Sequence, residues 1–135
     1  MFVKEMFGFA FGGKNDFGRL TETVGHEKLE FSNNPTGIGY AIRNGIEANI
    51  DRKKMVTVCI NTDSDVDMSF EFKTQNSNCS SEVSKEYEVK KGISNIAVLI
   101  PEKLSSPLKE IVIFFPRKAG RTDDVNISFG GVCLF

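Results

Sequence analysis

The feature that most constrains this chain is an alternation of apolar and polar residues with a period of two. A period of two sends successive side chains to opposite faces of a β-strand, so each run predicts a half-buried strand. Turn-forming residues such as Asn33-Asn34-Pro35, Asn44-Gly45 and Lys91-Gly92 separate the runs. The runs occupy residues 6–11, 38–43, 56–61, 68–73, 86–90, 95–100, 111–115 and 125–134.

Helices between the strands are what a parallel α/β architecture would need, and each would take about 10–15 amphipathic residues. The best helical candidate, Glu102 to Glu110, is interrupted by Pro107. Short strands at regular spacing are instead typical of a sandwich or a jelly roll. The sequence therefore predicts an all-β fold, a β-sandwich of two antiparallel sheets.

Length and charge narrow the class of protein further. The 135 residues suffice for one domain with its own core, so we expect a single β-sandwich domain over residues 1–135. The formal net charge of −1 gives no sign of a nucleic-acid partner. The sequence lacks the run of about 18 apolar residues that a membrane helix requires, so we expect no membrane partner.

Cysteine usage argues against a metal centre. The chain has three cysteines and one histidine, without a Cys-x-x-Cys pair or a Cys/His cluster, which speaks against zinc. Cys59 and Cys133 lie in apolar strand-like runs, where a free cysteine behaves as a small apolar residue. We expect both to be buried thiols.

Other groups that could carry chemistry are better explained as surface features. His26 is the only histidine and has no nucleophile motif beside it, so we expect no catalytic triad. The Asp63, Asp65 and Asp67 run has the spacing of a calcium loop but lacks that loop's later glycine and glutamate. Paired carboxylates for glycoside hydrolysis could come from three strand glutamates, which more often face solvent. These are Glu71, Glu86 and Glu88.

The alternation also gives each strand a second face, turned away from the core. Its polar residues could hydrogen-bond a ligand. The strand from Ile111 to Phe115 is apolar on both faces. It is therefore either a central strand with a covered second face or an apolar floor, formed by Val112 and Phe114, under a groove. The polar residues of the second face are Arg43, Thr57, Asn61, Ser69, Glu71 and Lys73.

The order of features from Tyr40 onward resembles the galactose-binding-like jelly-roll carbohydrate-binding modules, especially those attached to xylanases and glucanases. In that family a strand of the type Tyr-x-Val-Ser-Phe follows a turn, and a run of the type Ile-Asp-x-Val-x-Leu closes the module. The segments that carry the resemblance are 39–46, 55–61, 68–72, 84–89, 111–115 and 125–135.

The resemblance implies a non-catalytic module, not an enzyme, that binds a polysaccharide or another glycan on the open face of one sheet. Such a module would be covalently part of a larger multidomain protein, extracellular or at the cell surface if that protein is secreted. The family's acidic residue in the closing run is replaced here by glycine at Gly130-Gly131, which speaks against its structural calcium; we therefore expect no cofactor. The expected ligand-binding residues are Arg43, Asn61, Glu71, Lys73, Tyr40, Thr57 and Phe114.

A second interpretation remains open from the residues alone. The chain has no tryptophan, the aromatic residue that most often stacks on sugars, and most of its phenylalanines fall on expected core faces. A structural or protein-interaction sandwich, such as a phage, virion or surface-layer component, would have the same composition. The two-sided apolar strand Ile111 to Phe115 also fits this alternative.

Overall fold

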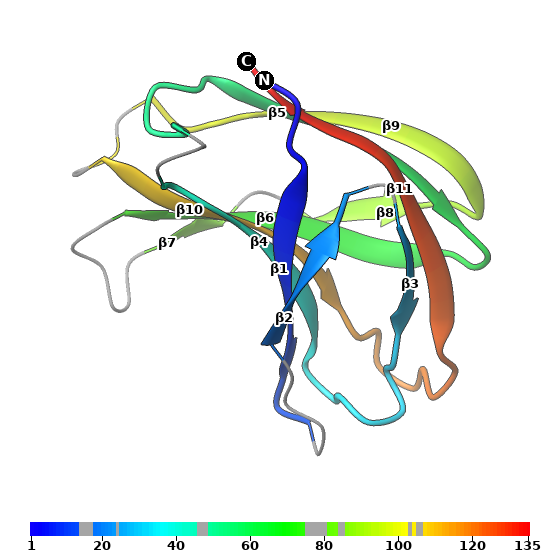
Figure 1. Cartoon of the computed structure of the whole chain (residues 1–135). Coiled ribbons are helices and arrows are strands. Elements are labelled where there is room, and N and C mark those ends of the chain that lie inside the picture. The colour runs from blue at the N-terminus through cyan, green and yellow to red at the C-terminus, as the bar shows by residue number, and fades with distance from the viewer. Residues whose placement is uncertain are drawn as a thin grey trace.

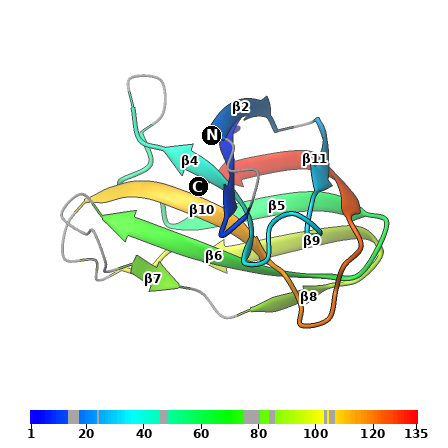
Figure 2. The same cartoon turned by 90° about the horizontal axis from the view of Figure 1, so that it is seen from below.

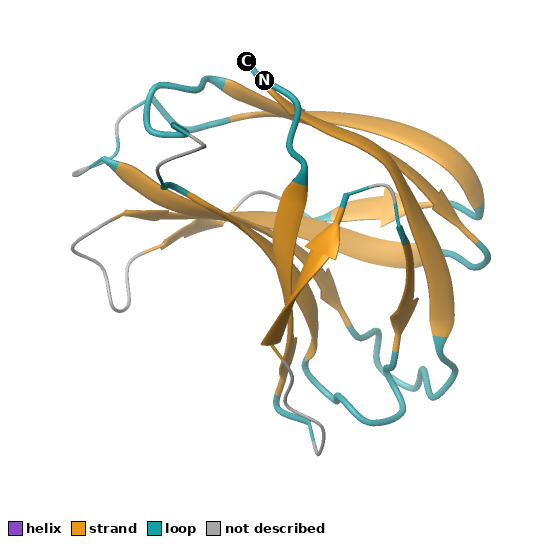
Figure 3. Ribbon diagram, viewed as in Figure 1, coloured by secondary structure: helices purple, strands orange, loops and turns teal. Residues whose placement is uncertain are grey.

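The computed structural model of the chain is built from β-strands alone in the part that it describes (Figure 3). The structure describes residues 1–13, 18–23, 25–45, 49–74, 81–83, 86–102, 104 and 107–135. The strands are β1 (Glu5–Phe11), β2 (Gly18–Glu22), β3 (His26–Leu29), β4 (Gly37–Arg43), β5 (Met55–Thr62), β6 (Val66–Thr74), β7 (Ser81–Val83), β8 (Tyr87–Val89), β9 (Gly92–Leu99), β10 (Leu108–Pro116) and β11 (Val125–Leu134).

Two antiparallel sheets make up the fold, as the alternation predicted (Figure 1). The large sheet has seven strands in the order β2-β1-β4-β10-β6-β7, with β8 also paired to β6. The small sheet has four strands in the order β3-β11-β5-β9. Both β7 and β8 lie along the same edge of β6 (Figure 2). The helical candidate Glu102 to Glu110 is wrong where the structure describes it, because Leu108 to Glu110 begin β10.

The strand pairing is nested around the connection between β6 and β8. β6 pairs with β8, β5 with β9, β4 with β10 and β3 with β11. Each pair therefore encloses the one before it, as in a long hairpin folded over on itself. Because β3, β4, β5 and β6 fall alternately in the small and the large sheet, the two sheets face each other across a common core.

The first residues of the chain connect the two sheets. Phe2 forms a β-bridge with Cys133 of the small sheet, and the Val3 amide donates to the Val132 carbonyl at 2.8 Å. From Glu5 onward the same segment runs as β1 in the large sheet, where Phe7 lies opposite Ala41 of β4. Both ends of the chain consequently lie side by side at one end of the molecule (Figure 1).

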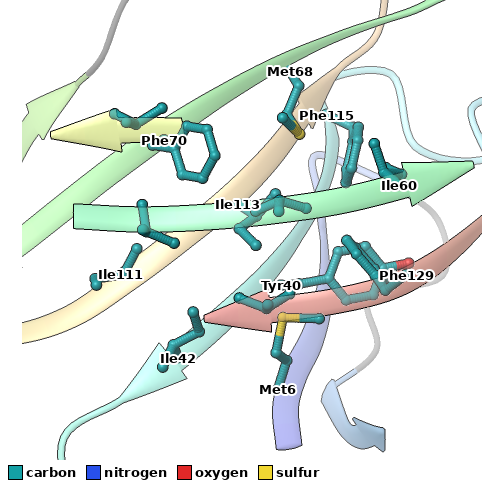
Figure 4. Packing of buried hydrophobic residues seen from close by; sticks show 14 of the residues in the cluster. Met6, Tyr40, Ile42, Ile60, Met68, Phe70, Ile111, Ile113, Phe115 and Phe129 are labelled. Atoms are coloured by element: carbon teal, nitrogen blue, oxygen red, sulfur yellow. The ribbon is translucent and has the colours of Figure 1, made fainter. Parts of the chain in front are cut away.

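The core lies between the sheets and takes one side chain from every second strand position. The core residues of β5 and β6 belong to opposite sheets, and each is at most 1% exposed. They are Val56, Val58 and Ile60 of β5 and Met68, Phe70 and Phe72 of β6. Burial of each such side chain stabilises the fold by about 1.5–3 kcal/mol. Figure 4 shows the packing around Tyr40. Its ring makes edge-to-face contacts with Phe115, at a centroid distance of 6.1 Å, and with Phe129, at 5.1 Å.

The cysteines occupy a different place from the one expected. Cys59 and Cys133 are free thiols, but both are only half-buried because they lie on the outer face of the small sheet. Their neighbours Val58, Ile60 and Val132 take the core positions. These valine and isoleucine residues, and not the cysteines, are therefore the side chains that the two strands bury. Cys79 lies outside the described residues.

Candidate functional site

The outer face of the large sheet carries two adjoining groups of side chains. One is an aromatic strip formed by Phe7, Phe9, Phe11 and Phe114. The other is a charged row formed by Arg43, Glu110, Lys73 and Glu71. The strands that supply them are β1, β4, β10 and β6, which are neighbours in the sheet.

The aromatic strip lies on either side of β4. Phe7, Phe9 and Phe11 alternate with the buried Met6 and Gly8, and Phe114 alternates with the buried Ile113 and Phe115. The Phe9 and Phe11 ring centroids are 4.7 Å apart, and the Phe11 and Phe114 centroids are 5.0 Å apart. Both contacts are edge-to-face, a favourable geometry for aromatic pairs.

Gly39 of β4 makes this close packing of the rings across the strand feasible. A Cβ atom at Gly39 would lie 3.1 Å from each of the Phe9 ring, the Phe11 ring and a Val112 methyl group. Val112 sits opposite Glu71 on the same face, yet it is fully buried. The strip and Val112 therefore form a small apolar layer outside the sheet, separate from the core.

The charged row crosses β4, β10 and β6 beside this layer. Arg43 lies opposite Glu110, which in turn lies opposite Lys73. The Arg43 Nε atom is 3.0 Å from Glu110 Oε2, and the Lys73 Nζ atom is 3.7 Å from both Glu110 Oε1 and Glu71 Oε1. The Glu110 side chain is only 15% exposed, so it is the centre that holds both cations.

Arg43 joins the two groups. Its guanidinium carbon lies 4.4 Å from the centroid of the Phe7 ring, within the range of a cation–π contact. Arg43 is thus held by Glu110 on one side and by Phe7 on the other. The other donors of its guanidinium group can reach a ligand lying on the sheet.

A groove of about 920 Å³ opens at the Phe7 and Arg43 end of the face. It arises because β1 pairs with β4 only from Phe7 to Phe11, and the chain before Phe7 leaves β4 to reach the small sheet. The exposed side chain of Leu20 on β2 forms part of its wall. Its lining includes Met1 to Phe7, Leu20, and Ala41 to Arg43.

The seven expected ligand-binding residues do not form one site. Arg43, Glu71, Lys73 and Phe114 come together on the outer face of the large sheet, as just described. Thr57 and Asn61 lie on β5, on the outer face of the small sheet and thus on the opposite side of the sandwich.

Tyr40 cannot contact a ligand on either outer face. Its side chain is 0% exposed and packs in the core against both Phe115 and Phe129 (Figure 4). The expectation that Tyr40 is one of the ligand-binding residues is therefore wrong. Tyr40 takes a core position because it alternates along β4 with Gly39 and Ala41, which lie on the outer face.

The sequence reasoning missed Glu110 and the three phenylalanines of β1. The phenylalanines of an alternating run normally point into the core. In β1 the core positions are instead taken by Met6 and Gly8. A signal was present in the neighbouring strand, where Gly37 and Gly39 leave room for rings on one face only. Glycine in a strand interior often marks such a close approach.

The other candidates considered from the sequence are separate surface groups. His26 is exposed on β3. Asp63 accepts bonds from the main chain and side chain of Asn126, Asp65 accepts the Lys91 amide at 2.7 Å, and Asp67 is 3.3 Å from the Lys118 ammonium. The three aspartates thus have different partners. Among the described residues, no group of three or more metal-ligating side chains is present.

The three strand glutamates considered for hydrolysis also have separate partners. Glu71 is paired with Lys73, and Glu88 with Lys90 at 2.6 Å. A hydrogen bond from Glu86 to Asp67, and the negative charge of Asp67, raise the pKa of Glu86. The hydrogen bond and charge of Lys90 lower the pKa of Glu88.

Comparison with known protein families and with curated proteins gave no match for this chain. No helix that could cross a membrane occurs in the part of the chain that the structure describes.

Proposed function

We propose that this protein is a non-catalytic carbohydrate-binding module that holds a polysaccharide or oligosaccharide on the outer face of its large sheet. One observation carries the proposal, namely that the aromatic strip and the charged row adjoin on that face and share Arg43. A pyranose ring has an apolar face of C–H groups and a rim of hydroxyls. It therefore needs an aromatic surface and fixed hydrogen-bonding groups at the same place.

The charged row suits hydroxyl recognition because its members are already ordered by one another. Charged donors and acceptors make hydrogen bonds stronger than neutral ones. Glu110 fixes the positions of Arg43 and Lys73, so less side-chain entropy is lost when a ligand binds. Glu71, at the end of the row, contributes an acceptor for hydroxyl protons.

We also propose that the sandwich is a jelly roll of the galactose-binding-like kind. Its support is the nested pairing of β3 with β11, β4 with β10, β5 with β9 and β6 with β8. A hairpin folded over on itself, with successive strands in alternate sheets, is the connectivity of two Greek keys in a jelly roll. β1 and β2 extend the large sheet beside β4.

Affinity gel electrophoresis with soluble β-glucan, xylan, mannan and pectin tests the proposal. We expect one of these polysaccharides to retard the protein, and Phe114→Ala to abolish the retardation by removing a ring of the strip. The control Asn61→Ala changes an exposed residue on the opposite face and should migrate like the native protein. The proposal fails if no polysaccharide retards the native protein, or if the two variants lose retardation equally.

A protein-interaction sandwich is the second candidate, and a separate observation favours it. Ile93 and Leu99 of β9 are 74% and 75% exposed, at the edge of the small sheet and away from the aromatic strip. Exposed apolar residues on a sheet edge are typical of association sites.

A further inference from the structure

Among the residues that the structure describes, β9 is a free edge of the small sheet. In the described part of the chain it pairs with β5 alone, from Gly92 to Leu99, without a register shift. Its eight residues include no charged residue and no proline. The other strands at sheet edges carry charges, such as Glu22 in β2, Lys28 in β3 and Glu88 in β8. Charges, prolines and bulges are the usual means of keeping an edge from pairing.

The hydrogen-bonding groups on the free side of β9 belong to alternate residues. The Ile100 amide donates to the Lys54 carbonyl at 2.8 Å, which fixes the phase of the β5–β9 ladder. In an antiparallel ladder every second residue bonds to one neighbour and the residues between bond to the other side. The backbone groups directed away from β5 are those of Ile93, Asn95, Ala97 and Leu99.

These four residues are symmetric about Ile96. An antiparallel copy of β9 centred on Ile96 places Ile93 opposite the partner's Leu99, and Asn95 opposite the partner's Ala97. All four pairs are of the hydrogen-bonded type, so every free amide and carbonyl of the four residues finds a partner. A shift of this register by two residues would leave only three bonded pairs, with one of the four residues in each copy unpaired.

The side chains obey the same symmetry. Ile93 and Leu99 project from the outer face of the small sheet, opposite Asn61 and Met55 of β5. In the centred register the Ile93 side chain of one copy lies beside the Leu99 side chain of the second copy. Each of the two therefore shields the other from water. Ile96, which is half-buried against the core, meets its own copy on the two-fold axis. Lack of charge matters here, since identical strands would bring like charges together.

We propose that two copies of this chain associate through antiparallel pairing of β9 with β9, which joins the two small sheets into one continuous sheet. Such a contact is isologous, because the same strand is used by both copies, and it therefore closes after two subunits. The occupant of the edge is a second copy because the free groups and the exposed side chains match one another in a single register.

Amide hydrogen exchange followed by NMR, together with light scattering, tests the proposal at low and high protein concentration. In the monomer, Ile93, Asn95, Ala97 and Leu99 should exchange quickly, while Ser94, Ile96 and Val98 are protected by β5. In the dimer the first four amides become protected, and we expect their exchange to slow by about tenfold or more over a hundredfold rise in concentration. Light scattering should show twice the monomer mass at the high concentration.

Two variants at one position separate the backbone contact from side-chain effects. Ala97→Pro removes an amide that has no partner in the described part of the chain, and edge strands tolerate such a substitution. It should stay monomeric. The control Ala97→Val keeps the amide and should dimerise like the native chain. If Ala97→Pro does not fold, the double variant Ile93→Lys with Leu99→Lys serves instead, because its charges should prevent pairing.

Three results would overturn the proposal. The first is a native chain that stays monomeric at every protein concentration. This result would overturn the proposal even if a peptide added as an extra strand protected the four edge amides. The second is a dimer in which those amides still exchange quickly. The third is a folded Ala97→Pro variant that dimerises as strongly as Ala97→Val.

Discussion

Gly37 and Gly39 are the residues on which the aromatic face depends most. Gly37 has a φ of +144°, and a Cβ atom there would lie 2.4 Å from the Phe115 carbonyl oxygen. Phe114 packs its ring on the same glycine, 2.8 Å from that Cβ position. The close approach of β4 to β10 at this point therefore excludes any side chain.

Gly37→Ala should destabilise the fold by about 2–3 kcal/mol, from backbone strain and the contact with β10. Chemical denaturation measures the change. Gly45→Ala is the matched control, because its Cβ atom would meet nothing within 4 Å. The control should stay within about 0.5 kcal/mol of the native chain. Equal stability of the two variants would contradict the packing described for Gly37.

Asp124 connects the start of β11 to the turn after β3. Its Oδ1 atom accepts the Ser32 amide at 3.2 Å and the Ser32 hydroxyl at 2.9 Å, and Lys28 is 3.6 Å from Oδ2. Burial by itself would raise the pKa of Asp124, but the Ser32 hydrogen bonds and the Lys28 charge outweigh it and lower that pKa.

Because the pKa of Asp124 is lower in the folded than in the unfolded chain, its carboxylate stabilises the fold above the unfolded value of about 3.9. This contribution is lost as the pH falls through the lowered folded value. Asp124→Asn should therefore cost about 1 kcal/mol at neutral pH and progressively less in acid. Urea denaturation across this pH range measures the difference. The control Asp123→Asn changes the exposed neighbour and should stay within about 0.5 kcal/mol of the native chain at neutral pH.

At the level of strands, the sequence predicted which residues point inward more reliably than which residues share a surface. The alternation correctly assigned Val58 of β5 and Phe70 of β6 to the core. It could not show that β5 belongs to a different sheet from β4 and β6, because alternation describes one strand at a time. Asn61 was consequently grouped with Arg43, although they lie on opposite outer faces.

The strand β1 was predicted as the run 6–11, but the outward direction of its phenylalanines was missed for a different reason. Both of its faces are apolar, and the larger residues lie outside, because β4 offers glycine there and the groups at the inner positions are Met6 and Gly8. Only the pairing of β1 with β4 decides this, and that pairing joins segments that are distant in sequence. The two apolar faces of Ile111 to Phe115, in contrast, were evident from the sequence, and Val112 and Phe114 do face outward.

A substitution of Glu110 tests whether the charged row, which spans three strands, acts as one unit in ligand binding. Glu110→Gln preserves the shape of the side chain but removes the charge that holds Arg43 and Lys73. We expect affinity for the bound glycan, measured by calorimetry, to fall about tenfold while stability changes by about 1 kcal/mol or less. Asn61→Ala, an exposed substitution on the outer face of the small sheet, is the control. Unchanged affinity in Glu110→Gln would show that the row does not order the ligand-binding groups.

On the scale of the whole molecule, the sandwich presents two outer faces with different characters. The large sheet offers rings and ordered charges around a groove, whereas the small sheet ends in an uncharged apolar edge at β9. These two surfaces lie on different sheets. The proposed glycan binding at the first and the proposed self-association at the second are therefore compatible, and we expect that each can be removed by substitution without loss of the other.

The measurement that tests the glycan-binding account most directly is an NMR titration of the isotope-labelled protein with the polysaccharide fragment that retards it in gels. If the glycan binds the outer face of the large sheet, the amide signals of Phe7, Phe9, Phe114 and Arg43 and the ring signals of these phenylalanines should shift with ligand concentration. The amide signals of Thr57 and Asn61 should stay unchanged. Shifts confined to the small sheet or to the loops, or a titration without any shift, would contradict it.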